Sequence, residues 1–254
     1  MAGKRALVLG AGGARGIAHL GLLQVLRREG LAPDLVVGCS AGAIFGALWA
    51  VNADLDRMER LLLWPGFTRR MFDLAVSREG LVKGDSVLEA MRLFTKNAVF
   101  ADLAVELAIV ATDIQTGELV VFREGNVAEA VRASVSIPGF FQPYQYQGRR
   151  LVDGAVKNRL PVQVARELGA GQIVAVDVKK NLMPDPRGAL NILLQSIEIL
   201  EEEVFRSHAG EADLLIQPEV GHIGSLQFER AAEAIELGRA AALAKSSEIR
   251  RFLE

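Results

Sequence analysis

A serine stands between small residues at Gly38-Cys39-Ser40-Ala41-Gly42, in the pattern G-x-S-x-G. The apolar run 34–38 precedes it and the small-residue-rich run 41–51 follows, which predicts a sharp turn from a strand into a helix. Such a turn lifts a serine hydroxyl clear of the backbone, and the amino end of the helix favours negative charge beside it. Ser40 is therefore a candidate nucleophile. The alternative is an ordinary strand-to-helix turn in which the serine only caps the helix.

Closely spaced glycines form a second motif, Gly10-Ala-Gly-Gly-Ala-Arg-Gly16, after the apolar run 5–10. Such glycines let backbone N–H groups point at one anion. A dinucleotide-binding loop is the competing interpretation, but Arg15 occupies the place of its third glycine, and no acidic residue ends the second predicted strand. The loop suits an oxyanion hole better, and two neighbouring parallel strands would bring it beside Ser40.

A serine hydroxyl needs a base, and Asp153 lies at the end of a short apolar stretch. The three histidines are poorer candidates. His19 falls in an apolar helical run, His208 in a charged helix, and only His222, in a glycine-bounded turn, remains open as an alternative. A direct Ser-Asp dyad is chemically adequate if partial burial raises the proton affinity of the carboxylate.

Together these motifs resemble the patatin-like phospholipases, most of all the short bacterial members similar to the esterase domain of the neuropathy-target-esterase group. The resemblance covers Arg5 to Leu168. It rests on four motifs in the family's order: the glycine-rich loop with Arg15, the elbow at Ser40, the segment 132–140, and Asp153-Gly-Ala155.

The resemblance implies an α/β fold, a three-layer α/β/α sandwich with a mainly parallel central sheet. It implies a Ser-Asp dyad without histidine, in which Ser40 is the nucleophile and Asp153 the base. The residues implied for the oxyanion hole are Gly12, Gly13 and Ala14, with Arg15 nearby, and those of the elbow are Gly38 and Gly42. Ala11 and Ala155 stand where many relatives have glycine, and only a positive φ at Ala11 would put the chemistry in doubt.

The activity implied is that of a serine esterase or lipid acyl hydrolase of the phospholipase A or lysophospholipase type. It would act on a lipid or long-chain ester through an acyl-enzyme, without a metal or organic cofactor. Transacylation by the same dyad is one alternative. A non-catalytic regulatory or scaffold protein that keeps the fold is another, which the intact Ser40, Asp153 and glycine loop disfavour.

Four further features have two interpretations each. Arg15 is expected to orient the glycine loop, rather than to bind a head group or form a surface ion pair. Cys39 is expected to point into the sheet. Ser134 and Ser136 are expected to cap or turn the chain, and Lys179-Lys180 to form a solvated loop. The segment 64–72 is either an amphipathic flap that touches lipid or, as we favour, a helix pair packed on the domain; its residues of interest are Trp64, Phe67, Arg69, Arg70, Met71 and Phe72.

The remaining pattern predicts one domain, 1–254, without repeats or linkers. Expected strands are 5–10, 34–38, 105–112, 118–122, 171–178 and 213–216; expected helices are 16–29, 41–51, 126–134, 190–208 and 228–251. Residues 54–96 read as irregularly helical with a break near 64–66. The segments 69–85 and 179–188 are expected to be soft.

Composition excludes several functional classes. The net charge of −2 argues against nucleic-acid binding, and the single cysteine excludes an intramolecular disulfide and a cysteine-rich zinc site. The basic start followed by an apolar run resembles a signal peptide, but the glycine loop interrupts that run. Without an apolar stretch of transmembrane length, we expect a cytoplasmic protein with at most peripheral membrane contact. The oligomeric state is left open.

Overall fold

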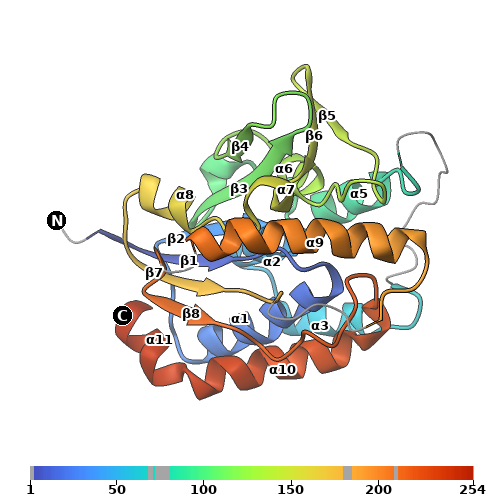
Figure 1. Ribbon diagram of the computed structural model, residues 1–254. Helices are drawn as coiled ribbons and strands as arrows, with labels where there is room; N and C mark the ends of the chain where they lie inside the picture. The colour runs from blue at the N-terminus through green and yellow to red at the C-terminus, as the bar shows by residue number, and fades with distance from the viewer. Residues whose placement is uncertain (1–2, 68–70, 72–79, 180–184, 209–210, 254) are drawn as a thin grey trace.

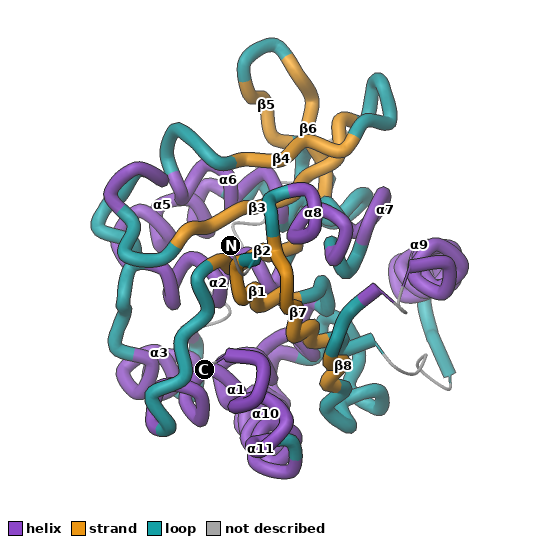
Figure 2. Tube along the Cα trace, turned by 90° about the vertical axis from the view of Figure 1, so that its left-hand side faces the viewer, coloured by secondary structure: helices purple, strands orange, loops and turns teal. Residues whose placement is uncertain are grey.

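The computed structural model describes residues 3–67, 71, 80–179, 185–208 and 211–253. Its eight described strands form one sheet in the order β5-β6-β3-β2-β1-β7-β8, with β4 paired to the same strand β3 (Figures 1 and 2). The strands are β1 Lys4–Leu9, β2 Leu35–Cys39, β3 Glu106–Asp113, β4 Leu119–Phe122, β5 Tyr144–Tyr146, β6 Arg149–Asp153, β7 Ala170–Val176 and β8 Leu214–Ile216. Five neighbouring strands, β3, β2, β1, β7 and β8, are parallel. The strands β4, β5 and β6 add antiparallel pairs on the β3 side of the sheet.

The central strands are apolar on both faces because helices cover both. Along β1, Leu7 and Leu9 pack into one hydrophobic cluster, whereas Ala6 and Val8 pack into a second one. This alternation follows from the two-residue period of a strand. The first cluster is completed by α1, α2, α6 and α10, and the second by α7, α8 and one residue of α9, so the three-layer sandwich expected from the sequence is confirmed.

The helices are α1 Ala18–Arg28, α2 Ala41–Ala50, α3 Leu55–Leu62, α5 Asp85–Phe94, α6 Val127–Ser134, α7 Ala155–Asn158, α8 Val162–Glu167, α9 Ala189–His208, α10 Ala231–Ala244 and α11 Ser246–Leu253. Their ends follow local chemistry. The Asn126 side chain accepts the N–H groups of Ala128 and Glu129 at the start of α6. Gly30, predicted from the sequence to end the first helix, follows α1 and has a positive φ of +69°, which glycine adopts readily.

One expectation from the pattern needs correction. The helix expected over 228–251 is divided: a 3₁₀ turn at Phe228–Arg230 precedes α10, and the chain bends at Lys245 before α11. The bend lets Ile249 and Leu253 be buried, and the Ser246 hydroxyl donates to Glu29 at that point. The region 54–96, expected to be irregularly helical, contains α3 and α5. Of the segments expected to be soft, residues 69–70, 72–79 and 180–184 lie outside the described residues.

Candidate active site

Ser40 lies at the turn between β2 and α2 with φ 54° and ψ −119°, a strained conformation for a residue with a side chain. The turn is held from outside its own sequence: the Ser40 N–H donates to the Ser134 hydroxyl at 2.8 Å, and that hydroxyl donates to the Val110 carbonyl at 2.7 Å. Ser134 is therefore a support of the elbow rather than a simple cap. Sequence reasoning missed this role because α6 and β3 meet the elbow only in the fold.

The glycines of the elbow are required by close packing. A Cβ atom on Gly42 would lie 2.0 Å from the Leu9 carbonyl oxygen, and one on Gly38 would lie 2.6 Å from the Gly42 carbonyl oxygen. Any larger residue would push α2 away from β1. The first turn of α2 can therefore lie directly beneath the serine only with glycine at both positions.

Asp153 meets Ser40 from another strand. It ends β6, which pairs with β3, and the Ser40 Oγ donates to its Oδ2 at 2.6 Å. Its other oxygen, Oδ1, accepts the Ala155 N–H at 2.9 Å. Both side chains are almost fully buried. The two residues are 113 positions apart in sequence, and the structure brings their reactive oxygens into direct contact.

Burial raises the pKa of the Asp153 carboxyl from 3.8 to about 6. The hydrogen bonds from Ser40 and Ala155 oppose this rise, as does the positive charge of Lys179, whereas the negative charge of Glu201 adds to it. A carboxylate with such a pKa is ionised at neutral pH yet a stronger base than an exposed aspartate. It is therefore able to accept a proton from the serine.

The glycine-rich loop follows β1 beside the elbow. Gly13 has φ +55°, and Ala11 does not have a positive φ, so the alanine at position 11 causes no strain. The Ala14 N–H donates to the Ser225 carbonyl oxygen at 2.8 Å and is not available as an oxyanion donor. Within the described chain the N–H groups of Gly12 and Gly13 have no acceptor, and these two residues line one small pocket together with Ser40.

Ser40 lies between two pockets with different linings. The larger, of about 150 Å³, is lined almost entirely by apolar side chains from α2, α3, α5 and neighbouring segments; examples are Ile44, Leu48, Met58, Met91 and Phe94. The smaller, of about 30 Å³, contains Asp153 and charged side chains from the end of β7 and from α9. An ester whose carbonyl lies at Ser40 could place its hydrocarbon chain in the first pocket and its alcohol portion in the second.

Residues 7–166 match the patatin-like phospholipase family. The chain belongs to the patatin-like phospholipases. It is 32% identical over 94% of its length to an uncharacterized NTE family protein of Mycobacterium tuberculosis, covering 46% of that protein. It is 33% identical over 68% of its length to patatin-like phospholipase domain-containing protein 6 of Mus musculus, covering 13% of that protein. The chain thus spans less than half the length of these curated relatives.

Solved structures show the same fold at low sequence identity. VipD from Legionella pneumophila matches with a TM-score of 0.63 at 16% identity, over 95% of this chain and 66% of that one. The type III effector protein ExoU matches with a TM-score of 0.53 at 16% identity, over 98% of this chain and 53% of that one. The patatin fold expected from the motifs is therefore confirmed.

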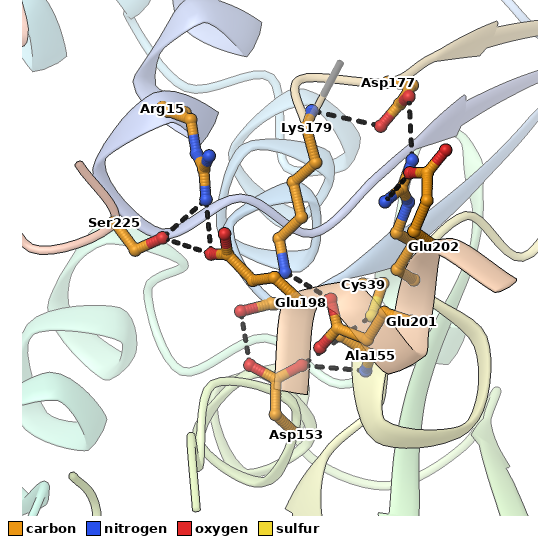
Figure 3. A network of polar contacts seen from close by, with 12 residues as sticks. Arg15, Cys39, Asp153, Ala155, Asp177, Lys179, Glu198, Glu201, Glu202 and Ser225 are labelled. Atoms are coloured by element: carbon orange, nitrogen blue, oxygen red, sulfur yellow. Dashed lines mark hydrogen bonds and ion pairs between the residues drawn. The ribbon is translucent and has the colours of Figure 1, made fainter. Parts of the chain in front are cut away.

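The expectation that Lys179 lies in a solvated loop is wrong. In this patatin-like chain the Lys179 side chain is only 9% exposed, forms an ion pair with Glu201 and lines the small pocket (Figure 3). Burial opposes its charge, but Glu201 and Glu198 outweigh burial and hold the pKa of Lys179 above its ordinary value. The sequence gives no local signal for this, because Glu198 and Glu201 come from α9, 19 and 22 residues further along the chain. Lys180 lies outside the described residues.

Arg15 is buried, and its guanidinium forms an ion pair with Glu198 and a 2.6 Å hydrogen bond to the Ser225 hydroxyl (Figure 3). It therefore ties the glycine-rich loop to α9 and to the 225 loop. This agrees with the preferred expectation of loop orientation and excludes a solvent-exposed ion pair. Its side chain is directed to these partners, and its neighbours Gly12 and Gly13 are the members of the described glycine-rich loop that line the small pocket beside Ser40 with amides lacking an acceptor.

The described histidine and cysteine side chains take no part in the hydrogen bond between Ser40 and Asp153. His19 is buried with Nε2 2.8 Å from the Gly10 carbonyl oxygen, and burial lowers its pKa to about 4. His222 is exposed and pairs with Glu233 at 2.7 Å; the His208 side chain lies outside the described part. Cys39 is buried in the second hydrophobic cluster, and its Sγ lies 3.9 Å from Asp153 Oδ1; burial, followed by the charge of Asp153, raises the pKa of its thiol.

Only part of the segment 64–72 can be placed. Phe67 and Met71 line the apolar cavity, and Trp64 is exposed, whereas Arg69, Arg70 and Phe72 lie outside the described residues. In the described ranges no three His, Cys, Asp or Glu side chains group as metal ligands. No helix in the same ranges has the length and apolar character needed to cross a membrane.

Proposed function

We propose that this chain is a serine acyl hydrolase in which Ser40 is the nucleophile and Asp153 its general base. The observation that carries the proposal is the 2.6 Å hydrogen bond from the Ser40 Oγ to a buried carboxylate whose pKa is about 6. The strained φ of Ser40 adds support, because a nucleophile elbow requires such a conformation. The family membership supports a lipid ester as the substrate.

The proposed reaction begins when Asp153 takes the hydroxyl proton while the Ser40 Oγ attacks the ester carbonyl carbon. The N–H groups of Gly12 and Gly13 stabilise the oxyanion of the tetrahedral intermediate; one such donor is worth about 3–4 kcal/mol. Asp153 then returns the proton to the departing alcohol as the ester C–O bond breaks, which leaves an acyl group on Ser40. A water molecule, deprotonated by Asp153, then attacks the acyl carbon; as the bond from this carbon to the Ser40 Oγ breaks, Asp153 returns the proton to that oxygen and the free acid leaves.

The shape of the site supports a long acyl chain. The cavity of about 150 Å³ begins at Ser40 and is lined by leucine, isoleucine, methionine and phenylalanine side chains. Each methylene buried there contributes roughly 0.8 kcal/mol to binding. Rates are therefore expected to rise with acyl length until the cavity is full, and we propose lipid or other long-chain esters as substrates.

The test is hydrolysis of p-nitrophenyl esters from acetate to palmitate by the wild type, Ser40→Ala and Ser196→Ala. Ser196 is exposed on α9 and serves as the matched control. We expect hydrolysis and labelling by a fluorophosphonate probe in the wild type and the control, and loss of both in Ser40→Ala. Folded wild-type protein that neither hydrolyses any ester nor reacts with the probe would overturn the proposal and favour a non-catalytic role.

A further inference from the structure

The polarity of α9 is reversed relative to an ordinary surface helix. Its buried side carries Glu198 and Glu201, which pair with Arg15 and Lys179, and Glu202 pairs with buried Arg159 (Figure 3). Charged groups usually occupy the outer side of a surface helix and apolar groups the inner side. Ion pairs therefore hold much of this helix against the domain.

The outer side of α9 is apolar. Ile192, Leu193, Ile199 and Leu200 are 53%, 48%, 48% and 69% exposed. From residue 192 to 200 the only other exposed residue is the uncharged Ser196, and exposed charges return only beyond this band, at Arg187 and Glu203. Figure 2 shows α9 end-on at the edge of the molecule, with one side turned away from the sheet. A contiguous apolar band of this kind marks an interaction surface.

The dimensions of the band favour a lipid surface over a second copy of the chain. Nine helical residues span only about 13 Å, roughly two and a half turns. A helix pair of the coiled-coil type needs about three heptads, and a stable protein interface buries roughly 800 Å² on each partner. Docking on a lipid surface requires neither the long helix nor the large interface, because each inserted side chain contributes its own burial energy. An uncharged band with charges at both ends also fits the boundary between acyl chains and head groups.

The position of α9 connects this band to the reaction centre. Leu194, Ile197, Glu198 and Glu201 of the same helix line the small pocket that contains Ser40 and Asp153. We propose that the outer face of α9, formed by Ile192, Leu193, Ile199 and Leu200, docks the chain on a lipid surface. The choice of lipid as the occupant rests on the proposed acyl hydrolase function; the exposed band itself does not.

The experiment measures partition onto phosphatidylcholine vesicles by flotation, in a Ser40→Ala background so that the lipid stays intact. The test variant is Ile199→Ser/Leu200→Ser. The matched control is Leu243→Ser, which replaces a 60% exposed leucine on α10, away from α9. Partition is expected to fall roughly tenfold or more in the test variant and less than twofold in the control.

Three results would overturn the proposal: the parent protein does not float, both variants lose partition equally, or light scattering finds a dimer that only the α9 variant dissociates. The last result would assign the face to a second copy. Hydrolysis of p-nitrophenyl butyrate, measured with Ser40 intact, is expected to be unchanged in both variants. Ser40-dependent hydrolysis without flotation would reject the docking face alone, and flotation without hydrolysis would reject the proposed function alone.

Discussion

Asp153→Asn is expected to abolish ester hydrolysis and, at neutral and alkaline pH, to stabilise the fold. Asparagine keeps the size of the side chain and can still accept the Ala155 N–H, but it cannot take the Ser40 proton. The substitution also removes a carboxylate that the interior disfavours, since burial is the main cause of its raised pKa. Activity and stability should therefore change in opposite directions.

The size of this effect follows from the linkage between protonation and folding. The Asp153 pKa rises from 3.8 to about 6, so the ionised form disfavours folding by about 3 kcal/mol. Because the folded pKa is the higher one, this group's contribution to wild-type stability is complete below about pH 4 and is lost as the pH rises through 6. The variant has no such loss. Its advantage in unfolding free energy should approach about 3 kcal/mol at pH 8 and vanish near pH 4.

Urea unfolding at pH 8, 6 and 4 measures this difference, with Ser40→Ala as the control. The control is also inactive but keeps the carboxylate and loses a hydrogen bond to it. It should therefore be no more stable than the wild type at pH 8. Two results would refute the view that burial is the main influence on the Asp153 carboxylate. One is an Asp153→Asn variant that is less stable than the wild type at pH 8, and the other is a variant whose advantage in unfolding free energy is the same at pH 4 and pH 8.

Two further predictions concern the surroundings of the Ser-Asp pair. For the wild type, kcat/KM on a soluble ester should rise with pH and reach half its maximum at about pH 6, because Asp153 must be ionised. Lys179→Met should move this midpoint to higher pH, since the lysine charge lowers the Asp153 pKa. A pH profile of the variant with an unchanged or lower midpoint would contradict this. Ser134→Ala leaves the buried Ser40 N–H without its acceptor, so calorimetry should show a loss of roughly 1–3 kcal/mol. The kcat of this variant should fall about tenfold with little change in KM, and wild-type kinetics would show that the elbow does not depend on Ser134.

The features that sequence could predict are those encoded locally. The elbow at Ser40, the glycine-rich loop and the buried strands each occupy a short continuous pattern, so their fold context followed from residue type and spacing. Lys179 and Ser134 could not be placed in this way. A lysine after a strand looks solvated until α9 brings two carboxylates over it, and a serine at the end of α6 looks like a cap until β3 places the Val110 carbonyl behind it.

Detail within a motif also depended on tertiary contacts. The glycine loop suggested three donor amides, but the Ser225 carbonyl, from a loop more than two hundred residues away, engages the Ala14 N–H. In the same way the helix expected over 228–251 has a continuous periodicity, and the bend at Lys245 reflects the packing of Ile249 and Leu253 rather than a helix-breaking residue.

The two pockets on either side of Ser40 have a kinetic consequence. An acyl-enzyme would keep its chain in the apolar cavity while the alcohol leaves through the smaller pocket that contains Asp153 and Lys179, so the two products would depart on different sides of one oxygen atom. Free fatty acid should then compete with the ester for the cavity, whereas the incoming acceptor must enter where the alcohol left. Hydrolysis and transacylation by this site would then differ only in whether water or an alcohol enters from the Lys179–Glu201 side of the serine.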